Sequence, residues 1–262
     1  MAVEAKGTPV YASERQQSML AEARALGRVE VIALAEQLGV TPETVRRDLT
    51  ALESRGLVRR VHGGALPVER LDAEISVATR MAKASAEKKR IAVRALEEIP
   101  RGGSVLLDSG TTTYALAEQL PTDQGLTVVT NSVSVAALLQ GRAGTELLLL
   151  GGRVRDRTGA AVGGWVVAAL SDLCVDVAFL GTNGYAVERG FTTPDQVEAA
   201  AKRAMAGAAR RVVVLSDASK AGQVHLHRFL GIDEAGMLIT DDALDDETAE
   251  RLENAGTEVV RT

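Results

Sequence analysis

The stretch Thr41-Pro-Glu-Thr-Val-Arg-Arg-Asp-Leu-Thr-Ala-Leu-Glu-Ser-Arg-Gly-Leu-Val-Arg-Arg-Val-His-Gly-Gly-Ala65 decides the fold of the first part of this 262-residue chain. Thr41 is a favourable N-cap, and Pro42 suits the first helical position because its missing N–H would have no partner there. The apolar residues that follow at helical spacing are Val45, Leu49 and Leu52. The spacing predicts an amphipathic helix. The side chains that it turns away from the core are those of Thr44, Arg46, Arg47 and Asp48.

Two further helices are predicted upstream. Apolar stripes at helical spacing occur in residues 13–26 and 31–38, and their members are Met19, Leu20, Ala23, Leu26, Val31, Leu34, Ala35 and Leu38. Gly39-Val40 is a turn of the length that joins two helices at a steep angle. The order is therefore helix, turn, helix, and three helices are enough to enclose a small core.

Residues 57–61 have the composition of a strand, and residues 62–64 that of a turn or return strand, so the three helices are followed by a basic hairpin. Each feature alone is common on protein surfaces, but the combination is typical of a winged helix-turn-helix that binds double-stranded DNA. Arginine suits this surface because its fork binds guanine or clamps a phosphate. The expected DNA contacts are Thr41, Glu43, Thr44, Arg46, Arg47, Arg59, Arg60 and His62.

The charge distribution agrees with a local DNA contact. Residues 1–70 hold 10 Lys or Arg against 9 Asp or Glu, whereas the remainder holds 20 against 26, and the net charge of the chain is −5. Within residues 46–60 five arginines face only Asp48 and Glu53. The larger part of the chain is acidic and would not bind DNA by bulk charge. A small module that is doubled by self-association into a dimer or tetramer fits this pattern better.

Composition predicts a cytoplasmic protein without membrane spans. No run of eighteen apolar residues occurs, and the N-terminus lacks a signal-peptide pattern. The single cysteine, Cys174, lies between Leu173 and Val175 and is expected to be a small buried apolar residue. No cluster of Cys or His residues indicates a metal site, and no cofactor is expected.

The domains are predicted as a DNA-binding domain over residues 11–66, a linker over 67–84 and a second domain over 85–262. The second domain starts with a helix from Ser85 onward, whose apolar stripe lies within residues 91–99 and whose exposed side is expected to carry Lys88, Lys89 and Arg90. Short Val- and Leu-rich runs then alternate with helical stretches, which indicates a mostly parallel, doubly wound α/β sheet. The expected strands are 105–107, 126–129, 146–150, 177–180, 212–215 and 237–239.

Donor-rich loops follow five of these strands. Ligands of doubly wound sheets bind at the carboxyl ends of the strands, and a helix start with hydroxyls and a glycine binds anions. Gly, Ser, Thr and Asn are ordinary turn residues, but their recurrence at successive strand ends predicts a pocket for a small phosphorylated ligand. The loop residues assigned to it are Ser109, Gly110, Thr111, Thr112, Thr113, Thr130, Asn131, Ser132, Gly152, Arg153, Gly181, Asn183, Asp217 and Lys220.

The chain resembles DeoR-family bacterial transcription regulators over nearly its whole length. The motifs that carry the likeness are Thr-Pro-Glu-Thr-Val-Arg-Arg-Asp-Leu at 41–49, Arg-Val-His-Gly-Gly-Ala at 60–65, Leu-Asp-Ser-Gly-Thr-Thr-Thr at 107–113, Thr-Asn at 130–131 and Asp-Ala-Ser-Lys at 217–220. The resemblance implies a repressor of a sugar operon whose C-terminal domain is similar to ribose-5-phosphate isomerase and glucosamine-6-phosphate deaminase.

The resemblance also implies residue roles. Residues 109–113 would hold the phosphate of a sugar, and the side chains expected to face the sugar are Asp108, Asn131, Glu198, Lys202, Asp217 and Lys220. Residues 11–15 are similar to regulators of fructose utilisation, which puts fructose 1-phosphate first among the candidate effectors. The rival hypothesis is a sugar-phosphate isomerase or deaminase, because Asp108, Glu198 and Lys202 are residue types that move protons. A DNA-reading module makes a regulator without catalytic residues the favoured interpretation.

Overall fold

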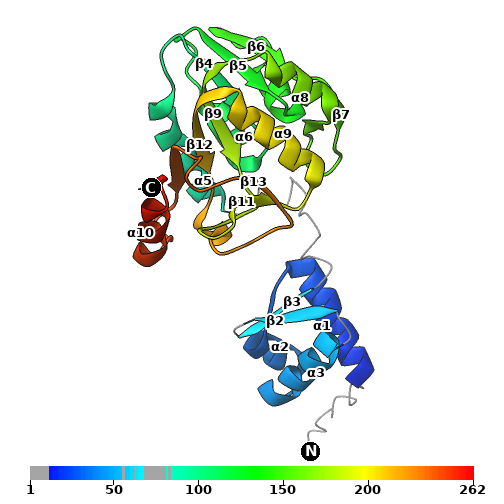
Figure 1. Cartoon of the computed structure of the whole chain (residues 1–262). Coiled ribbons are helices and arrows are strands. Elements are labelled where there is room, and N and C mark those ends of the chain that lie inside the picture. Colours follow the sequence, from blue (N-terminus) through cyan, green and yellow to red (C-terminus); the bar gives the residue numbers. More distant parts are fainter. Residues whose placement is uncertain (1–11, 55–56, 62, 68–80, 82–83) are drawn as a thin grey trace, which may run out of the picture. The chain divides into compact units, whose positions relative to one another are not determined.

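The computed structural model describes residues 12–54, 57–61, 63–67, 81 and 84–262 (Figure 1). Tyr11, His62 and most of the predicted linker lie outside the described residues. The chain divides into two compact units, one within Met1–Glu74 and the other within Ile75–Thr262. No helix in the described ranges is both long and apolar enough to cross a membrane.

The N-terminal unit is a winged helix-turn-helix, as predicted. Its elements are α1 (Ala12–Leu26), β1 (Val29–Glu30), α2 (Val31–Leu38), α3 (Pro42–Ser54), β2 (Val58–Val61) and β3 (Gly64–Pro67). β3 pairs with both β1 and β2 in antiparallel fashion. Gly39 ends α2 in the left-handed conformation, with φ of 63°, which favours glycine and makes the tight turn into α3 possible. The fully buried side chains include Met19, Leu34, Leu49 and Leu52.

Two predictions for this unit are wrong. Leu26 is 69% exposed because it is the last residue of α1, where the chain turns away at Gly27. Asp48 is buried, because it lies three residues after Val45 and four before Leu52, on the same face of α3. Its carboxylate accepts hydrogen bonds from Arg15 Nε at 2.6 Å and Gln16 Nε2 at 2.9 Å. Asp48 therefore joins α3 to α1 rather than facing a ligand.

The C-terminal unit contains a seven-stranded parallel sheet in the order β15-β14-β12-β9-β4-β5-β6. These strands are β4 (Ser104–Leu107), β5 (Leu126–Thr130), β6 (Thr145–Leu149), β9 (Val175–Gly181), β12 (Ala209–Leu215), β14 (Met237–Thr240) and β15 (Glu258–Arg261). All six predicted strands are present. β15 was not predicted from the sequence. Neither were two smaller sheets, formed by β7 (Arg153–Val154) with β8 (Ala161–Val162) and by β10 (Gly184–Ala186), β11 (Gly190–Thr193) and β13 (His227–Leu230).

Helices cover both faces of the large sheet, which confirms the doubly wound α/β class. One buried cluster joins alternate strand residues to Ile91, Leu116 and Val135, and the helices that contribute are α5 (Ser85–Ala95), α6 (Thr111–Gln119) and α7 (Val133–Leu139). The cluster on the other face includes Val166 and Met205. Its helices are α8 (Gly164–Ser171), α9 (Gln196–Gly207) and α10 (Asp246–Asn254). The short 3-10 turns are η2 (Leu96–Glu98) and η3 (Ala218–Lys220).

Two exposure predictions for this unit are also wrong. Lys88 is buried, because it precedes Ile91 by three residues and therefore lies on the apolar stripe of α5. Cys174 is exposed, because it comes before the first buried residue of β9, Val175, in the connection from α8.

Candidate functional site

The first turn of α3 carries exposed side chains, and a cap holds the start of the helix. The Thr41 hydroxyl accepts a hydrogen bond from the Thr44 N–H at 3.2 Å and lies 3.0 Å from the Thr44 hydroxyl, so it caps the helix as predicted. Arg46 Nη1 donates to Glu43 Oε2 at 2.9 Å, but both side chains stay largely in solvent. Arg47 is exposed as well. Helix α3 therefore presents two guanidinium groups that are available to a partner.

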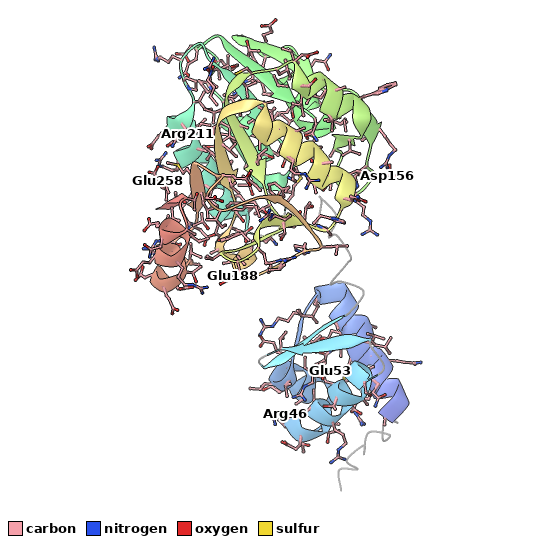
Figure 2. All side chains as sticks on the ribbon, viewed as in Figure 1. Arg46, Glu53, Asp156, Glu188, Arg211 and Glu258 are labelled. Carbon is pink, nitrogen blue, oxygen red and sulfur yellow. The ribbon has the colours of Figure 1, made fainter. Side chains whose placement is uncertain are left out.

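The wing is tied to α3 by Arg60. The Arg60 N–H donates to Glu53 Oε1 at 2.9 Å, and its Nη1 donates to Thr50 Oγ1 at 3.1 Å; Figure 2 labels Arg46 and Glu53 on this unit. Arg59 lies in β2 opposite Leu66 of β3. Gly64 permits the close approach of β1, since a Cβ at this position would lie 2.0 Å from the Val29 carbonyl oxygen. The wing and α3 are thus joined by hydrogen bonds.

The predicted ligand loops of the C-terminal unit lie at one edge of the large sheet. Its strands are parallel, so the segments after β4, β5, β6, β9 and β12 all leave at their carboxyl ends. The strand order reverses between β4 and β9, which makes their ends the topological switch point where such sheets bind ligands. Asp108 follows β4, and Gly181 ends β9.

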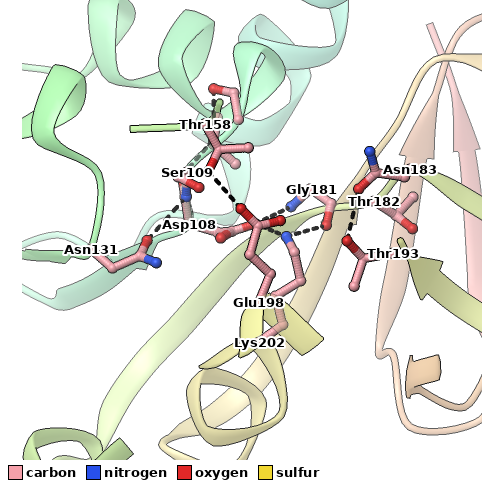
Figure 3. A network of polar contacts seen from close by, with 12 residues as sticks. Asp108, Ser109, Asn131, Thr158, Gly181, Thr182, Asn183, Thr193, Glu198 and Lys202 are labelled. Carbon is pink, nitrogen blue, oxygen red and sulfur yellow. Dashed lines mark hydrogen bonds and ion pairs between the residues drawn. The ribbon is translucent and has the colours of Figure 1, made fainter. Parts of the chain in front are cut away.

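A buried ion pair occupies this switch point (Figure 3). Lys202 of α9 donates from Nζ to Asp108 Oδ2, and also to the Gly181 carbonyl oxygen at 2.8 Å. The Gly181 N–H donates to the same carboxylate oxygen at 3.1 Å. Lys202 Nζ also lies 5.2 Å from the ring centroid of Phe229. Both charged groups are nearly inaccessible to solvent, with side-chain exposures of 6% and 2%.

Burial raises the pKa of Asp108, because removal from water disfavours the carboxylate. Lys202 opposes this shift through its charge and its hydrogen bond, whereas the nearby negative charge of Glu198 adds to it. A raised pKa is common at functional sites and also occurs in structural ion pairs. The arrangement places a buried cation and a buried anion in direct contact at the switch point.

Glu198 and Lys202 are one turn apart on α9, but their partners differ. Glu198 Oε1 accepts hydrogen bonds from the Thr158 hydroxyl at 2.5 Å and from Arg155 Nη1. Arg155 also pairs with Asp195, the N-cap of α9, at 3.0 Å. Arg155 and Thr158 belong to the turn between β7 and β8. This hairpin is therefore bound to α9 through Glu198, which was expected to face a sugar.

The predicted phosphate loop begins α6. Asn131 links it to the hairpin, because its Oδ1 accepts from the Ser109 N–H at 3.1 Å and its Nδ2 donates to the Ala161 carbonyl at 3.0 Å. Thr113 is fully buried, and its hydroxyl donates to the Asp108 carbonyl oxygen at 2.6 Å. The first amides of a helix have no intrahelical acceptor, so those of residues 111–113 are suited to an anion. Gly110 and the side chains of Thr111 and Thr112 lie at this helix start.

The remaining predicted residues lie at the same edge but outside the Asp108 contacts described above. Thr130 and Ser132 support the backbone after β5, since Thr130 donates to the Leu107 carbonyl at 2.7 Å. Asn183 accepts from Thr193 and His225 approaches its carbonyl at 3.2 Å. The other positions are Gly152 and Arg153, after β6, and Asp217 and Lys220, after β12, two strands from β4.

Several polar residues at this edge of the sheet were missed by the sequence analysis. Arg155 and Thr158 lie in a hairpin too short to give a strand signal, and Asp195 is the N-cap of α9. Asp241 follows β14 and accepts from the Ala218 N–H at 2.7 Å, which holds the loop of Asp217. The available signal was the position of Asp241, two residues after the predicted strand 237–239. A hollow of about 320 Å³ beside Asp195 is lined by Arg153, Arg155 and Arg157.

The two units together define a DNA-binding transcription regulator with a ligand-sensing type of α/β domain. Residues 15–70 match the DeoR-like helix-turn-helix domain, and residues 83–242 match the DeoR C-terminal sensor domain. The chain belongs to the DeoR family of transcriptional repressors.

Two known transcription regulators support the same assignment by their sequences. The chain is 40% identical to the HTH-type transcriptional regulator GlpR of Haloferax volcanii, covering 88% of this chain and 90% of the relative. It is 32% identical to the glycerol-3-phosphate regulon repressor of Escherichia coli, covering 80% and 83%. These relatives are named as regulators rather than enzymes, which disfavours the isomerase hypothesis. Ribose 5-phosphate isomerase A of Methanocaldococcus jannaschii is 16% identical with a TM-score of 0.39, covering 54% of this chain and 56% of that structure.

Proposed function

We propose that the protein represses a sugar-uptake or sugar-catabolism operon and that a phosphorylated sugar bound at the β4–β9 switch point controls its affinity for operator DNA. Fructose 1-phosphate is the first candidate, on the likeness of residues 11–15 to fructose regulators. The observation that carries the proposal is the buried Asp108–Lys202 pair beside the start of α6. A relative named for the glycerol-3-phosphate regulon supports a small phosphorylated effector.

The chemistry of the residues at this sheet edge supports a distinct role for each of them. The first-turn amides of α6 would bind the phosphate, and Thr111 and Thr112 would add hydroxyl donors. Lys202 and Asp108, which are bonded to each other and to Gly181, would exchange hydrogen bonds with sugar hydroxyls. Lys220 and Arg153 supply further positive charge at the same sheet edge. Asn131 and Glu198 would hold the phosphate loop and the hairpin in place through the contacts already described.

Control of DNA binding requires only that the effector prefers one of two arrangements of a dimer or tetramer. Recognition of two operator half-sites depends on the spacing of two helix-turn-helix heads. An effector that alters the arrangement of the sensor units would change this spacing and so change the affinity. The DNA contacts would come from Thr41, Glu43, Thr44, Arg46, Arg47, Arg59, Arg60 and His62.

A thermal-shift screen of sugar phosphates tests the sensor proposal. A specific ligand at a hundredfold excess over its dissociation constant stabilises the native state by about 2.7 kcal/mol. Fructose 1-phosphate is expected to raise the melting temperature, and the Thr111→Ala, Lys220→Ala double variant is expected to lose most of that rise. Lys89→Ala on the exposed side of α5 is the matched control. An undiminished response of the double variant would contradict the assigned pocket.

A further inference from the structure

A concave surface of the N-terminal unit lies between the wing and α3. This hollow has a volume of about 440 Å³, and its lining includes Arg28, Glu30, Ile32, Arg46 and Arg60. The residues come from four places in the sequence: the end of the α1–β1 connection, the junction of β1 with α2, the first half of α3, and β2. Only Arg46 and Arg60 are among the predicted DNA contacts.

Positive charge dominates this hollow. Three arginines and one glutamate line it, so the lining side chains carry a net positive charge, and one of these arginines, Arg46, is also paired with Glu43. Arg28 Nη2 lies 3.8 Å from Glu30 Oε1, and both side chains are more than half exposed. A pair so exposed and so distant contributes little stability. Arginines from the α1–β1 connection, α3 and β2 thus converge on one concave surface, and their guanidinium groups are suited to an anion.

The backbone around the hollow is held in advance of binding. Arg60 is fixed to α3 by its bonds to Glu53 and Thr50, and the Thr50 hydroxyl bonds in turn to the Arg46 carbonyl oxygen at 2.9 Å. β1, which carries Glu30, pairs with β3 of the wing. The three arginines are therefore presented by a single connected frame, so that binding an anion orders few additional groups.

An exposed apolar side chain at the same hollow favours a nucleic-acid backbone over a free anion as the ligand. Ile32 is 67% exposed although it is large and aliphatic. A free phosphate ion offers it no apolar partner, whereas the deoxyribose beside a DNA phosphate does. The combination of arginines and one exposed isoleucine fits a sugar-phosphate unit of duplex DNA.

We propose that this hollow is a phosphate-binding site for the DNA backbone in which Arg28 is a further DNA contact, Ile32 packs on a deoxyribose and Glu30 weakens the site electrostatically. The inference rests on the proposed DNA-contacting surface of α3 and the wing. Its three residues have different signatures in a salt titration, because only charged contacts change the slope of log K against log [salt].

The test measures binding of the full-length protein to a random-sequence 30-base-pair duplex. Fluorescence anisotropy reports the binding at salt concentrations between 50 and 200 mM. Arg28→Ala is expected to weaken binding about three- to tenfold and to reduce the salt slope by about 0.9. Ile32→Ala is expected to weaken binding about two- to fivefold with an unchanged slope, since it carries no charge. Glu30→Gln is expected to strengthen binding about two- to fivefold.

Arg101→Ala, an exposed arginine of the C-terminal unit, is the matched control. If the wild-type chain binds the duplex and Arg46→Ala with Arg47→Ala weakens it, but Arg28→Ala keeps the slope of Arg101→Ala, the hollow proposal is wrong while the DNA-contacting surface stands. If Arg46→Ala with Arg47→Ala has no effect, the surface itself is wrong. Inorganic phosphate that competes as strongly as duplex DNA at equal phosphate concentration would show an anion site without a role for the sugar.

Discussion

The surface formed by α3 and the wing and the polar cluster at the β4–β9 switch point both contain charged residues, but the first holds them in solvent and the second in the interior. Arg46 and Glu43 are paired in solvent, with exposures of 48% and 78%, whereas Lys202 and Asp108 are paired in the interior. Solvent already satisfies the exposed groups, so a substitution there is expected to cost little stability. At the buried pair the same kind of substitution leaves a charge without its partner. We therefore expect DNA binding and stability to be separable in the first region, and ligand binding and stability to be coupled in the second.

The largest effect on stability is expected for the buried pair of Asp108 and Lys202. Lys202→Met leaves Asp108 buried without its counter-charge and is expected to lower the free energy of unfolding by about 3–5 kcal/mol. The measurement is a urea titration at pH 7 followed by circular dichroism. Asp108→Asn combined with Lys202→Met removes both charges and should recover most of the loss. Equal destabilisation by the single and the double variant would show that the pair is not coupled.

Tyr185 of β10 is a second buried polar group, and its titration tests how burial links stability to pH. Burial raises its pKa to about 12, from an ordinary value near 10. Because the folded-state pKa is raised, the stability that the neutral phenol contributes is complete below pH 10 and is lost as the pH rises toward 12. The expected loss is about 2–3 kcal/mol. Absorbance titration at 295 nm should show a late tyrosine step near pH 12 that Tyr185→Phe abolishes; a step at the ordinary value in the native protein would contradict this burial.

The smallest effect on stability is expected at Arg47. Arg47→Ala should change the free energy of unfolding by less than about 0.5 kcal/mol, because its side chain is exposed. If Arg47 contacts a base, the same variant weakens operator binding by about 1–3 kcal/mol. Gel-shift titration at fixed salt measures the second quantity, with Arg101→Ala as control. A loss of stability that accounts for the loss of binding would remove the distinction between the two regions.

The same contrast explains what could be predicted from the sequence. The helix-turn-helix, its wing and six strands of the large sheet follow from local periodicity and caps, and the structure confirms them. Asp48 and Lys88 were assigned to solvent because charged residues usually lie there, but both share a face with apolar neighbours. Only tertiary packing decides such a case, as the bonds from Arg15 and Gln16 to Asp48 demonstrate.

The place of the polar cluster in the sheet could be predicted from the ends of the strands. The contacts among its residues could not. Parallel strands bring their carboxyl ends to one edge, so the loops after five strands could be assigned together. The contact of Glu198 with Arg155 and Thr158 joins residues more than 35 positions apart through a hairpin with two residues in each strand. No local pattern encodes that contact. The roles of the site residues toward a ligand stay predictions. The domain boundaries at 66 and 85 stay predictions as well.

The measurement that tests the central claim most directly is operator binding of the full-length protein with and without effector. DNA from the region upstream of the regulated operon is titrated at fixed salt in the presence of saturating fructose 1-phosphate or another sugar phosphate that raises the melting temperature. A coupling of about 1–3 kcal/mol predicts that the effector changes the DNA dissociation constant by about 5- to 150-fold. The Thr111→Ala, Lys220→Ala variant should bind DNA normally and lose this response. A sugar phosphate that stabilises the protein but leaves its DNA affinity unchanged would contradict the account.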